Sequence, residues 1–311
     1  MMSNKTIALI GASGFIGRRI LRALTLEGHQ VVAVIRSTSD SGLELPSGSK
    51  ICRCTLSATD KGLRDALFES DAVIYAAGAV RGNSIDDFRL ANISGVEAVV
   101  NILEGMQMAP PFLLLSSLAA SAPHLSDYAQ SKRDGETVLD NYPKLSTTIF
   151  RPPAVYGPGD KEMRPLFDWM RRGVSLQLGP DNQRLSLLHV DDLASAAISW
   201  LNCDGSARGC FELHDGQEGG YSLKEIANTV APEKSIRVVN LPKSVLSIAA
   251  KLNRRLAKLT GKMPMLSPGK ARELTHPEWV CDNIEITKAI NWSPEVSLRQ
   301  GIQNLYSELK E

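Results

Sequence analysis

A tyrosine and a lysine, Tyr128 and Lys132, stand four residues apart in the segment "SDYAQSKRDGE". On a helix, positions four apart share a face, so the two side chains would project in the same direction. A free phenol has a pKa of about 10, and a cation held nearby lowers that pKa. Lys132 would therefore prepare Tyr128 for proton exchange at neutral pH. Ser117, in the upstream "LLLSS", would hydrogen-bond a substrate oxygen and orient it toward Tyr128. The set predicts proton transfer beside a hydride-carrying cofactor.

A glycine-rich turn near the start of the chain is the candidate site for that cofactor. "GASGFIG" follows the apolar run "TIALI" and contains Gly11, Gly14 and Gly17. The first glycine permits a tight turn, the second lets the main chain approach a pyrophosphate, and the third lets a helix pack closely on a sheet. Glycine triplets also occur for steric reasons alone, but a strand before and a helix after predict a dinucleotide site.

The end of the second strand discriminates between the two common dinucleotides. NAD-binding chains generally place an acidic residue there for the ribose hydroxyls, whereas "VVAVIRSTSD" has Arg36 and no carboxylate before Asp40. A guanidinium group binds a 2′-phosphate that a carboxylate would repel. We therefore favour NADP(H), with Arg36 as the 2′-phosphate ligand and Ser37 as a helper. NAD(H) stays possible, since Arg36 can also be a solvated strand end.

The elements that must position these residues alternate along the first half of the chain. Apolar runs such as "VVAVI", "AVIYAAG" and "FLLLSS" are separated by patterns with helical periodicity. This alternation predicts an α/β fold, a Rossmann-type doubly wound parallel sheet, over residues 1–155. We expect "RPPAVYGPGD" to be a shaped loop, the sheet to be rejoined at about residues 185–213, and residues 156–311 to form mostly a smaller C-terminal substrate-binding lobe.

Two further segments have competing interpretations. The helix expected at 244–259 is basic and amphipathic; packing on its own lobe is the interpretation we favour, and a membrane surface is the alternative. In "HVDD", His189 and the two aspartates suggest a metal or a catalytic dyad, but helix N-capping by Asp191 or Asp192 is the simpler interpretation.

Composition narrows the class of partner. Lys and Arg number 35 against 34 Asp and Glu, so no overall field favours nucleic acid or an anionic membrane. The five cysteines are scattered without the paired spacing of a zinc site, and no metal is expected. No apolar segment approaches the roughly 20 residues that span a bilayer. We expect a cytoplasmic protein that acts on a small-molecule substrate.

Several of these motifs occur together in one known family. "GASGFIG", "AAGAV", "LANISGVEAVVNIL", "LLLSS", "YAQSK", "FRPPAVYGPGD" and "LLHVDDLA" stand in that order, and "AINWSPEVSLRQGI" closes the chain. Over essentially its whole length the sequence resembles the extended short-chain dehydrogenase/reductase family, the NAD-dependent epimerase/dehydratase-like proteins. The resemblance implies catalytic roles for Ser117, Tyr128 and Lys132, and it would fit a homodimer. The implied cofactor contacts come from Gly11, Ser13, Gly14, Phe15, Ile16, Gly17, Ala76, Ala77, Gly78, Asn92, Tyr128, Lys132, Pro153 and Val155.

Three departures from the family pattern bear on the substrate. Thr55 stands where members usually have an adenine-binding Asp, so adenine would rely on Leu56 and the main chain. Only ten residues separate Ser117 from Tyr128, which shortens one wall of the substrate pocket. Arg184, the candidate phosphate clamp for a nucleotide sugar, stands five rather than four residues before "HV". The resemblance therefore supports a nucleotide-sugar substrate less strongly than it supports the fold.

Three functions remain in competition at this point. The leading one is an NAD(P)-dependent oxidoreductase that interconverts a carbonyl and a secondary alcohol. The second is a nucleotide-sugar epimerase or dehydratase that retains its cofactor. The third is a non-catalytic nucleotide-binding accessory protein, against which the intact Ser117, Tyr128 and Lys132 argue.

Overall fold

The structure is a computed structural model that describes residues 4–37, 42–43, 45, 47–260 and 263–307. Within those residues, seven strands form one sheet in the order β11-β6-β5-β4-β1-β2-β3, and each neighbouring pair is parallel. Its strands are β1 (Thr6–Ile10), β2 (Gln30–Arg36), β3 (Lys50–Cys54), β4 (Ala72–Tyr75), β5 (Phe112–Leu115), β6 (Thr147–Arg151) and β11 (Gly209–Glu212). The strand order reverses between β1 and β4, as in a Rossmann-type doubly wound fold.

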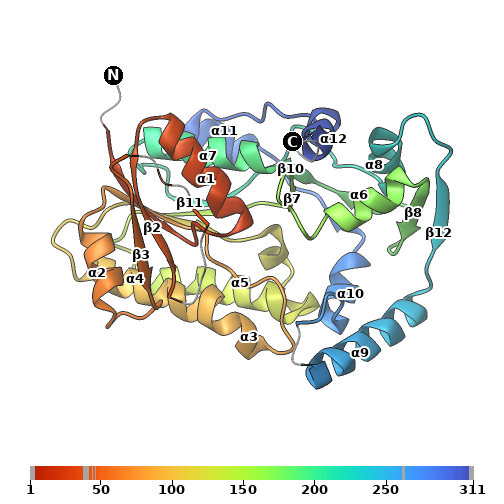
Figure 1. Cartoon of the computed structure of the whole chain (residues 1–311), viewed down its shortest axis with the longest axis horizontal. Coiled ribbons are helices and arrows are strands. Elements are labelled where there is room, and N and C mark those ends of the chain that lie inside the picture. Colours follow the sequence, from red (N-terminus) through yellow and green to blue (C-terminus); the bar gives the residue numbers. More distant parts are fainter. Residues whose placement is uncertain (1–3, 38–41, 44, 46, 261–262, 308–311) are drawn as a thin grey trace.

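Helices cover both faces of this sheet (Figure 1). They are α1 (Phe15–Leu26), α2 (Lys61–Phe68), α3 (Ile85–Arg89), α4 (Gly95–Glu104), α5 (Asp127–Val138), α7 (Val190–Asn202) and α11 (Ile284–Ile290). A π-helical turn, η1 (Leu90–Ser94), joins α3 to α4, and 3₁₀ turns η2 (Leu118–Ser121), η3 (Pro123–Leu125) and η4 (Leu139–Asn141) flank α5. The strands are buried on both faces, which explains their continuous apolar runs.

Two hydrophobic cores lie on the two faces of the sheet. One contains Ile20 and Leu24 of α1 and Leu193 of α7, and the other contains Leu63 of α2 and Val99 of α4. In Figure 1, α1, α7 and α11 accordingly lie above the sheet, and α2, α4 and α5 below it. The predicted fold class is confirmed.

The C-terminal lobe, which we call the substrate lobe after its predicted role, extends from one end of the sheet and is built from short strands and helices (Figure 1). Its strands form the separate pairs β7 (Ala154–Tyr156) with β10 (Leu187–His189), β8 (Val174–Gln177) with β12 (Arg237–Asn240), and β9 (Arg184–Leu185) with β13 (Glu278–Trp279). Its helices are α6 (Arg164–Arg171), α8 (Leu223–Val230), α9 (Lys243–Thr260), α10 (Pro268–Leu274) and α12 (Leu298–Ser307). A third core, around Phe167, Ile226 and Ile302, joins α6, α8 and α12.

Two details differ from the expected arrangement of the chain. The segment 151–160 is not all loop, because Ala154–Tyr156 forms β7. Within residues 185–213 the large sheet is extended by β11 beside β6, whereas β10, just before "VDDLA", pairs with β7 outside that sheet. Strand–helix order along the sequence does not specify which neighbour a short strand finds.

The described residues contain neither a membrane-spanning helix nor a group of metal ligands. No helix among them is both long and apolar enough to cross a bilayer. Nor do they contain a group of three or more His, Cys, Asp or Glu side chains placed to hold a metal ion.

Candidate active site

The glycine-rich turn lies against the loop that follows β4, with no space between their main chains. Gly11 has φ +86°, and a Cβ atom there would lie 2.6 Å from the amide nitrogen of Ala77. A Cβ on Gly17 would lie 2.1 Å from the carbonyl oxygen of Gly11. Glycine is therefore required at both positions for α1 to begin this close to the sheet. Gly14 is the exposed N-cap of α1, whose first turn has no acidic residue, so the turn fits a pyrophosphate group.

The other predicted cofactor contacts of the sheet edge surround this turn. Ser13, Phe15 and Ile16 lie at the start of α1 and are partly exposed. Gly78 is exposed just beyond β4, and a Cβ there would lie 3.5 Å from the Lys132 amine. The remaining positions are partly exposed: Ala76 and Ala77 beside Gly78, and Pro153 and Val155 beyond β6. These residues follow strands β1, β4 and β6 at their carboxyl ends, where α/β sheets bind ligands.

Asn92 lies in the π-helical turn and is buried. Its side-chain amide donates to the Ala79 carbonyl at 3.1 Å and to the Ser131 hydroxyl at 2.8 Å, and its oxygen accepts from the Ala79 amide at 2.9 Å. Tyr75 donates to the carbonyl of Ala91 in the same turn, at 2.6 Å. The polar atoms of Asn92 therefore connect the loop after Gly78 to helix α5, and its side chain positions those elements.

The predicted adenine side of the site has less definition. Arg36 ends β2 opposite Cys54, and its side chain and Ser37 are exposed. Thr55 donates twice to the Asp60 carboxylate, at 2.9 and 2.7 Å, and Asp60 caps helix α2. Leu56 packs partly against the core below the sheet. Leu56 thus offers an apolar side chain directly after Thr55, where adenine is expected.

The end of β5 and helix α5 hold the three predicted catalytic residues at one edge of the sheet. Ser117 follows β5 and caps η2, and its hydroxyl oxygen accepts from the Ala119 amide at 3.2 Å. The Ser117 hydroxyl also forms a hydrogen bond with the Tyr128 phenol. The Tyr128 ring packs on Phe88 of α3 with 6.1 Å between centroids. Lys132 is buried, and its amine donates to the Leu115 carbonyl at 2.8 Å.

The electrostatics of Tyr128 differ from the expectation. Burial raises the pKa of Tyr128, the hydrogen bond from Ser117 lowers it, and Glu273 raises it further. The expectation that the pKa of Tyr128 lies below its ordinary value is therefore wrong, because burial outweighs the groups that lower it. Burial lowers the pKa of Lys132 to about 8, against a smaller opposing effect of Glu136. The Tyr128 phenol is thus protonated at neutral pH, whereas the Lys132 ammonium group begins to lose its proton not far above neutral pH.

A buried carboxylate supports Lys132 from the next turn of α5. Glu136 accepts from the Ser116 hydroxyl at 2.5 Å and from both Nε and a terminal nitrogen of Arg151, the Nε bond being 2.9 Å. Arg133 adds a contact at 3.2 Å. A buried charge requires partners, and these three side chains provide them for Glu136. The network therefore holds the Glu136 carboxylate in place one turn of α5 after Lys132.

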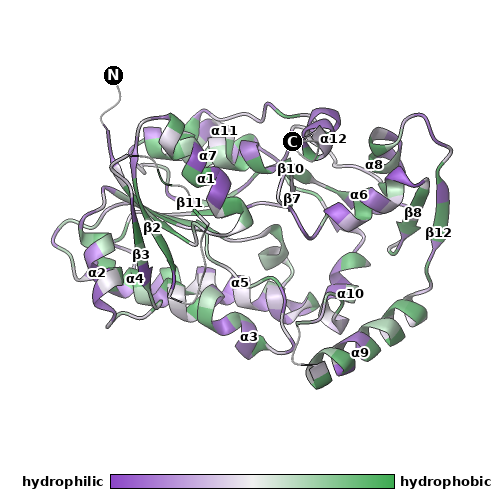
Figure 2. Ribbon diagram, in the orientation of Figure 1, coloured by the Kyte–Doolittle hydropathy of each residue, from purple (hydrophilic) through white to green (hydrophobic). Residues whose placement is uncertain are grey.

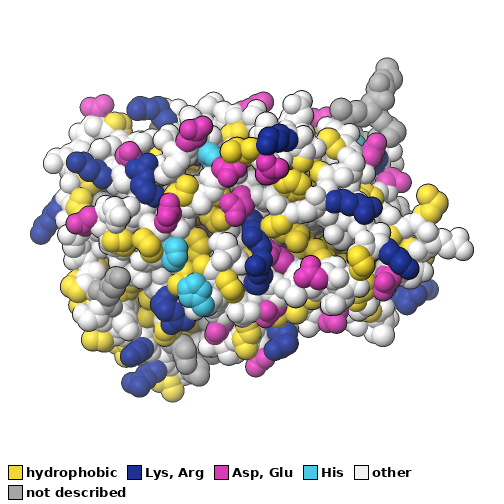
Figure 3. Space-filling model, turned by 180° about the vertical axis from the view of Figure 1, so that it is seen from behind, with side chains coloured by type: hydrophobic (Ala, Val, Ile, Leu, Met, Phe, Trp, Pro, Cys, Tyr) yellow, Lys and Arg dark blue, Asp and Glu magenta, His cyan; other side chains and the backbone are white. Residues whose placement is uncertain are grey.

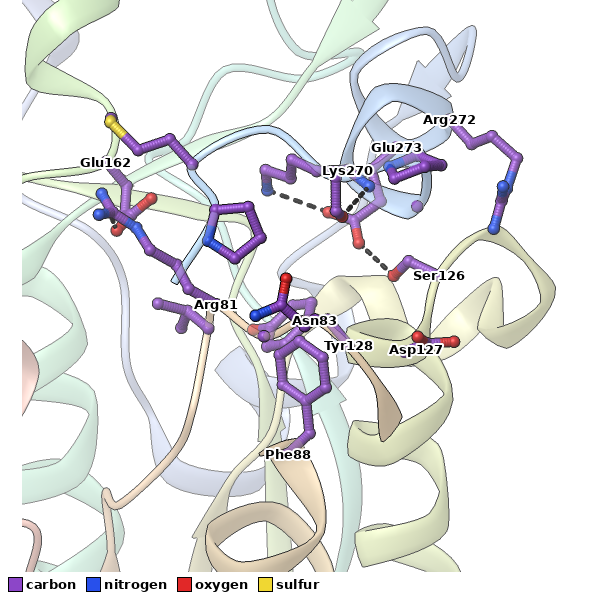
Figure 4. A pocket seen from close by; sticks show the side chains of 17 residues that line it. Arg81, Asn83, Phe88, Ser126, Asp127, Tyr128, Glu162, Lys270, Arg272 and Glu273 are labelled. Atoms are coloured by element: carbon purple, nitrogen blue, oxygen red, sulfur yellow. Dashed lines mark hydrogen bonds and ion pairs between the residues drawn. The ribbon is translucent and has the colours of Figure 1, made fainter. Parts of the chain in front are cut away.

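A cavity of about 110 Å³ lies over Tyr128, and the substrate lobe forms much of its wall. Figure 4 shows Glu273 of α10 between Lys270 and Ser126. The Lys270 amine lies 3.0 Å from the Glu273 carboxylate, which also accepts a short hydrogen bond from the Ser126 hydroxyl. Arg81 pairs with Glu162 at 2.8 Å across the same cavity. These charged groups surround the position at which a substrate would reach Tyr128.

The sequence did not identify these lobe residues as part of the site. Lys270 and Glu273 lie about 140 residues after Tyr128 and belong to no catalytic motif. Two contacts bring them there: Arg272 donates to the Leu125 carbonyl at 2.7 Å, and a Cβ on Gly269 would lie 2.7 Å from Cβ of Ser126. The one local signal is the "SPGK" start of α10, where Ser267 caps the helix.

Three arginines of the site and the lobe, whose charge could hold a substrate anion, are engaged in ion pairs. Arg151 binds Glu136, and Arg164 lies 3.7 Å from Asp168. Arg184 lies 2.9 Å from Glu225 and donates to the carbonyls of Gly219 and Gly220. Arg184 is therefore not free to clamp a phosphate in this arrangement.

The "HVDD" segment also has a structural role, although not the expected one. His189 caps α7 and accepts from the Asp191 amide at 3.4 Å, so the prediction of an aspartate cap is wrong. Asp192 instead accepts from the amides of Glu295 and Val296, at 3.0 and 3.1 Å. It thereby attaches the segment before α12 to the first turn of α7.

Curated proteins with related sequences include reductases, subunits of NADH-ubiquinone oxidoreductase and a UDP-glucose 4-epimerase by their names. The chain is 30% identical over 292 residues to the ceramide reductase of Caulobacter vibrioides, covering 91% of this chain and 88% of that protein. It is 23% identical to the 2-alkyl-3-oxoalkanoate reductase of Stenotrophomonas maltophilia, covering 96% and 98%.

A solved structure shares the fold. The UDP-glucuronic acid 4-epimerase from Bacillus cereus, in complex with UDP-glucuronic acid and NAD, superposes with a TM-score of 0.74 over 98% of this chain and 99% of that one, at 20% identity. The family model described as the NAD dependent epimerase/dehydratase family matches residues 7–206, which include the glycine-rich turn, Ser117, Tyr128 and Lys132. This chain therefore belongs to the NAD dependent epimerase/dehydratase family, within the extended short-chain dehydrogenases/reductases.

Proposed function

We propose that this protein is an NADPH-dependent reductase that converts a ketone on a long-chain, lipid-like molecule into a secondary alcohol. The observation that carries the proposal is the position of Tyr128, which lines the cavity and lies close enough to Ser117 for that hydroxyl to affect its pKa. A protonated phenol is the form that donates a proton to a carbonyl oxygen, which is the direction of reduction.

Each residue of the site has a defined role in this reaction. When bound, NADPH would supply the hydride that reduces the carbonyl carbon. The Ser117 hydroxyl hydrogen-bonds the carbonyl oxygen and orients it, and Tyr128 delivers the proton to that oxygen as the C=O double bond becomes a C–O single bond. The Lys132 ammonium, beside Gly78, stabilises the phenolate that Tyr128 becomes. The turn from Gly11 to Gly17 would hold the pyrophosphate.

Two features support NADPH rather than NADH. Arg36 is exposed at the end of β2, the strand next to β1 and its glycine turn. Neither Arg36 nor Ser37 places a negative charge where a 2′-phosphate would lie. A guanidinium group forms charge-assisted hydrogen bonds with phosphate, so Arg36 would select the phosphorylated dinucleotide.

The pocket favours an elongated ketone over a nucleotide sugar. Its volume of about 110 Å³ is well below the roughly 300–1,000 Å³ of sites that enclose a drug-sized ligand. The reacting end of a long molecule fits such a space while the rest leaves past Pro264 and Met265, which line it. The names of the two reductase relatives agree with this class of substrate.

The epimerase alternative requires a diphosphate ligand on the substrate lobe. The candidate clamp, Arg184, would first have to leave Glu225 and two carbonyl oxygens. An accessory role without catalysis predicts that loss of the Tyr128 hydroxyl has no effect.

Purified protein supplied with NADPH and a long-chain 3-keto lipid tests the proposal. We expect NADPH oxidation, and we expect Tyr128→Phe to lower its rate about 10²–10⁴-fold while leaving NADPH binding intact, because only the proton donor is removed. Turnover of UDP-glucose without net NADPH oxidation would support the epimerase alternative and contradict the proposal.

A further inference from the structure

Helix α9 packs on the rest of the protein along one edge only of its apolar face. It spans Lys243–Thr260, and Leu246 and Ala250 contact Ala271 of α10 in a small separate core. Figure 1 shows α9 at the outer end of the substrate lobe, beyond α10. The expectation that this helix packs on its own lobe therefore accounts for only part of its apolar surface.

The remaining apolar side chains of α9 form an exposed stripe. Val245, Ile248, Leu252, Leu256 and Leu259 are each 50–83% exposed. Their spacing of three and four residues places them on one face, because α-helical positions at those intervals lie above one another. Figure 2 shows hydrophobic residues along the length of this helix. We call these five residues the α9 stripe.

The stripe is bordered by positive charge. The sequence of α9 contains Lys and Arg but no Asp or Glu, and neither acid occurs anywhere in residues 234–272. Lys251 and Arg255, on the helix face next to the stripe, are exposed. In Figure 3, seen from behind, Lys and Arg side chains gather at the corner of the molecule that α9 occupies. An occupant of this surface must therefore be both apolar and anionic.

A membrane surface with anionic lipids meets both conditions. Amphipathic helices with a basic polar face lie in the plane of such an interface, with the apolar face among the acyl chains and the cations at the headgroups. A second copy of this chain meets only the first, because a symmetric contact between two α9 helices would bring like charges together. The balanced net charge of the whole chain is no objection, since the basic surface is local.

Two further exposed apolar side chains follow α9 in the sequence, and one of them lines the candidate pocket. Met263 and Met265, which follow α9, are also at least half exposed. Met265 and the adjacent Pro264 line the cavity that Tyr128 lines from the other side. A bilayer in contact with the stripe would therefore lie at the mouth of that cavity.

We propose that α9 docks this protein on an anionic membrane surface through the α9 stripe and its flanking cations, and that the pocket opens toward that surface. The docking stands on α9 alone and is independent of the proposed reductase activity. A ketone held in the bilayer would then reach Tyr128 past Met265 without crossing water.

Vesicle flotation of the full-length protein tests the docking without reference to activity. We expect the protein to float with vesicles of phosphatidylcholine and phosphatidylglycerol mixed about two to one, and to bind pure phosphatidylcholine at least about tenfold more weakly. The variant with Ile248→Ser, Leu252→Ser and Leu259→Ser should lose at least about nine-tenths of the bound fraction. Lys251→Glu with Arg255→Glu should reduce binding to the anionic vesicles alone.

The matched control removes three other exposed apolar side chains. Leu26, Phe68 and Met108 are more than half exposed and lie outside α9, so serine at all three positions should leave flotation unchanged. Failure of the wild-type protein to float, equal binding to neutral vesicles, or equal loss in the control would overturn the proposal. Sedimentation velocity identifies the other occupant: a wild-type dimer that the stripe variant turns into monomer, without vesicle binding, would assign the stripe to a second copy.

Discussion

The two halves of the site are held in place by different kinds of contact. On the cofactor side, main chains touch where glycines leave no space for a Cβ, as at Gly11 and Gly17. On the substrate side, α10 reaches Tyr128 through a few polar bonds and one close approach at Gly269, and α9 leaves apolar side chains exposed. The first half is thus fixed by main-chain packing, whereas the second depends on a few side-chain contacts and leaves apolar surface exposed.

The largest effect is expected where the cofactor half is packed most tightly. Gly17→Ala would place a methyl group 2.1 Å from the Gly11 carbonyl oxygen, which is main chain and cannot rotate away. We expect a loss of about 3 kcal/mol in the free energy of unfolding, and weaker NADPH binding because α1 must move. Urea denaturation and NADPH fluorescence titration measure the two.

Gly105→Ala is the matched control for that substitution. Gly105 has ordinary helical φ, and a Cβ there would be no nearer than 3.4 Å to another atom. Its free energy of unfolding should stay within about 0.5 kcal/mol of the wild-type value. If the two variants are equally stable, tight packing does not distinguish the cofactor half.

A smaller effect is expected at the adenine end, where the contact is a surface charge. Arg36→Ala should weaken NADPH binding about ten- to hundredfold, because a hydrogen bond to a charged group contributes about 1.5–3 kcal/mol. NADH affinity should change less than about threefold, since NADH carries no 2′-phosphate. Equal losses for the two dinucleotides, measured by titration, would remove Arg36 from the 2′-phosphate site.

The smallest effect is expected on the substrate side. Gly269→Val would push α10 away from Ser126, where a Cβ already lies at only 2.7 Å, and would displace Lys270 and Glu273 from the cavity. We expect KM for the ketone to rise about three- to tenfold, since lobe contacts of about 1 kcal/mol are lost. NADPH affinity should be unaffected, and a fall in it would show that the two halves are coupled.

The same contrast explains how much the sequence could predict. The sheet and the glycine turn were predictable because each rests on local signals: buried strands read as apolar runs, and main-chain approach requires glycine at fixed intervals. The candidate catalytic residues follow those elements directly along the chain. The lobe gave weaker signals, because its short strands pair with neighbours that periodicity does not specify.

Several features of the candidate site could not be predicted from the sequence. Lys270 and Glu273 reach Tyr128 only through tertiary packing of α10. Asn92 could be assigned to the cofactor by motif, but its bonds to Ala79 and Ser131 depend on a π-helical turn that periodicity does not reveal. The direction of the Tyr128 pKa shift depended on burial, which four-residue spacing cannot report.

The central claim is that protonated Tyr128 donates beside a Lys132 ammonium whose pKa is about 8. Because Lys132 is charged below that pKa and neutral above it, kcat/KM for ketone reduction should be high at neutral pH and fall as pH rises through about 8. The Glu136 carboxylate raises this pKa, so Glu136→Gln should move the decline to lower pH. The most direct measurement is the pH dependence of kcat/KM for both proteins at saturating NADPH. A rate that stays level through about pH 8, or a decline that Glu136→Gln leaves in place, would contradict the account.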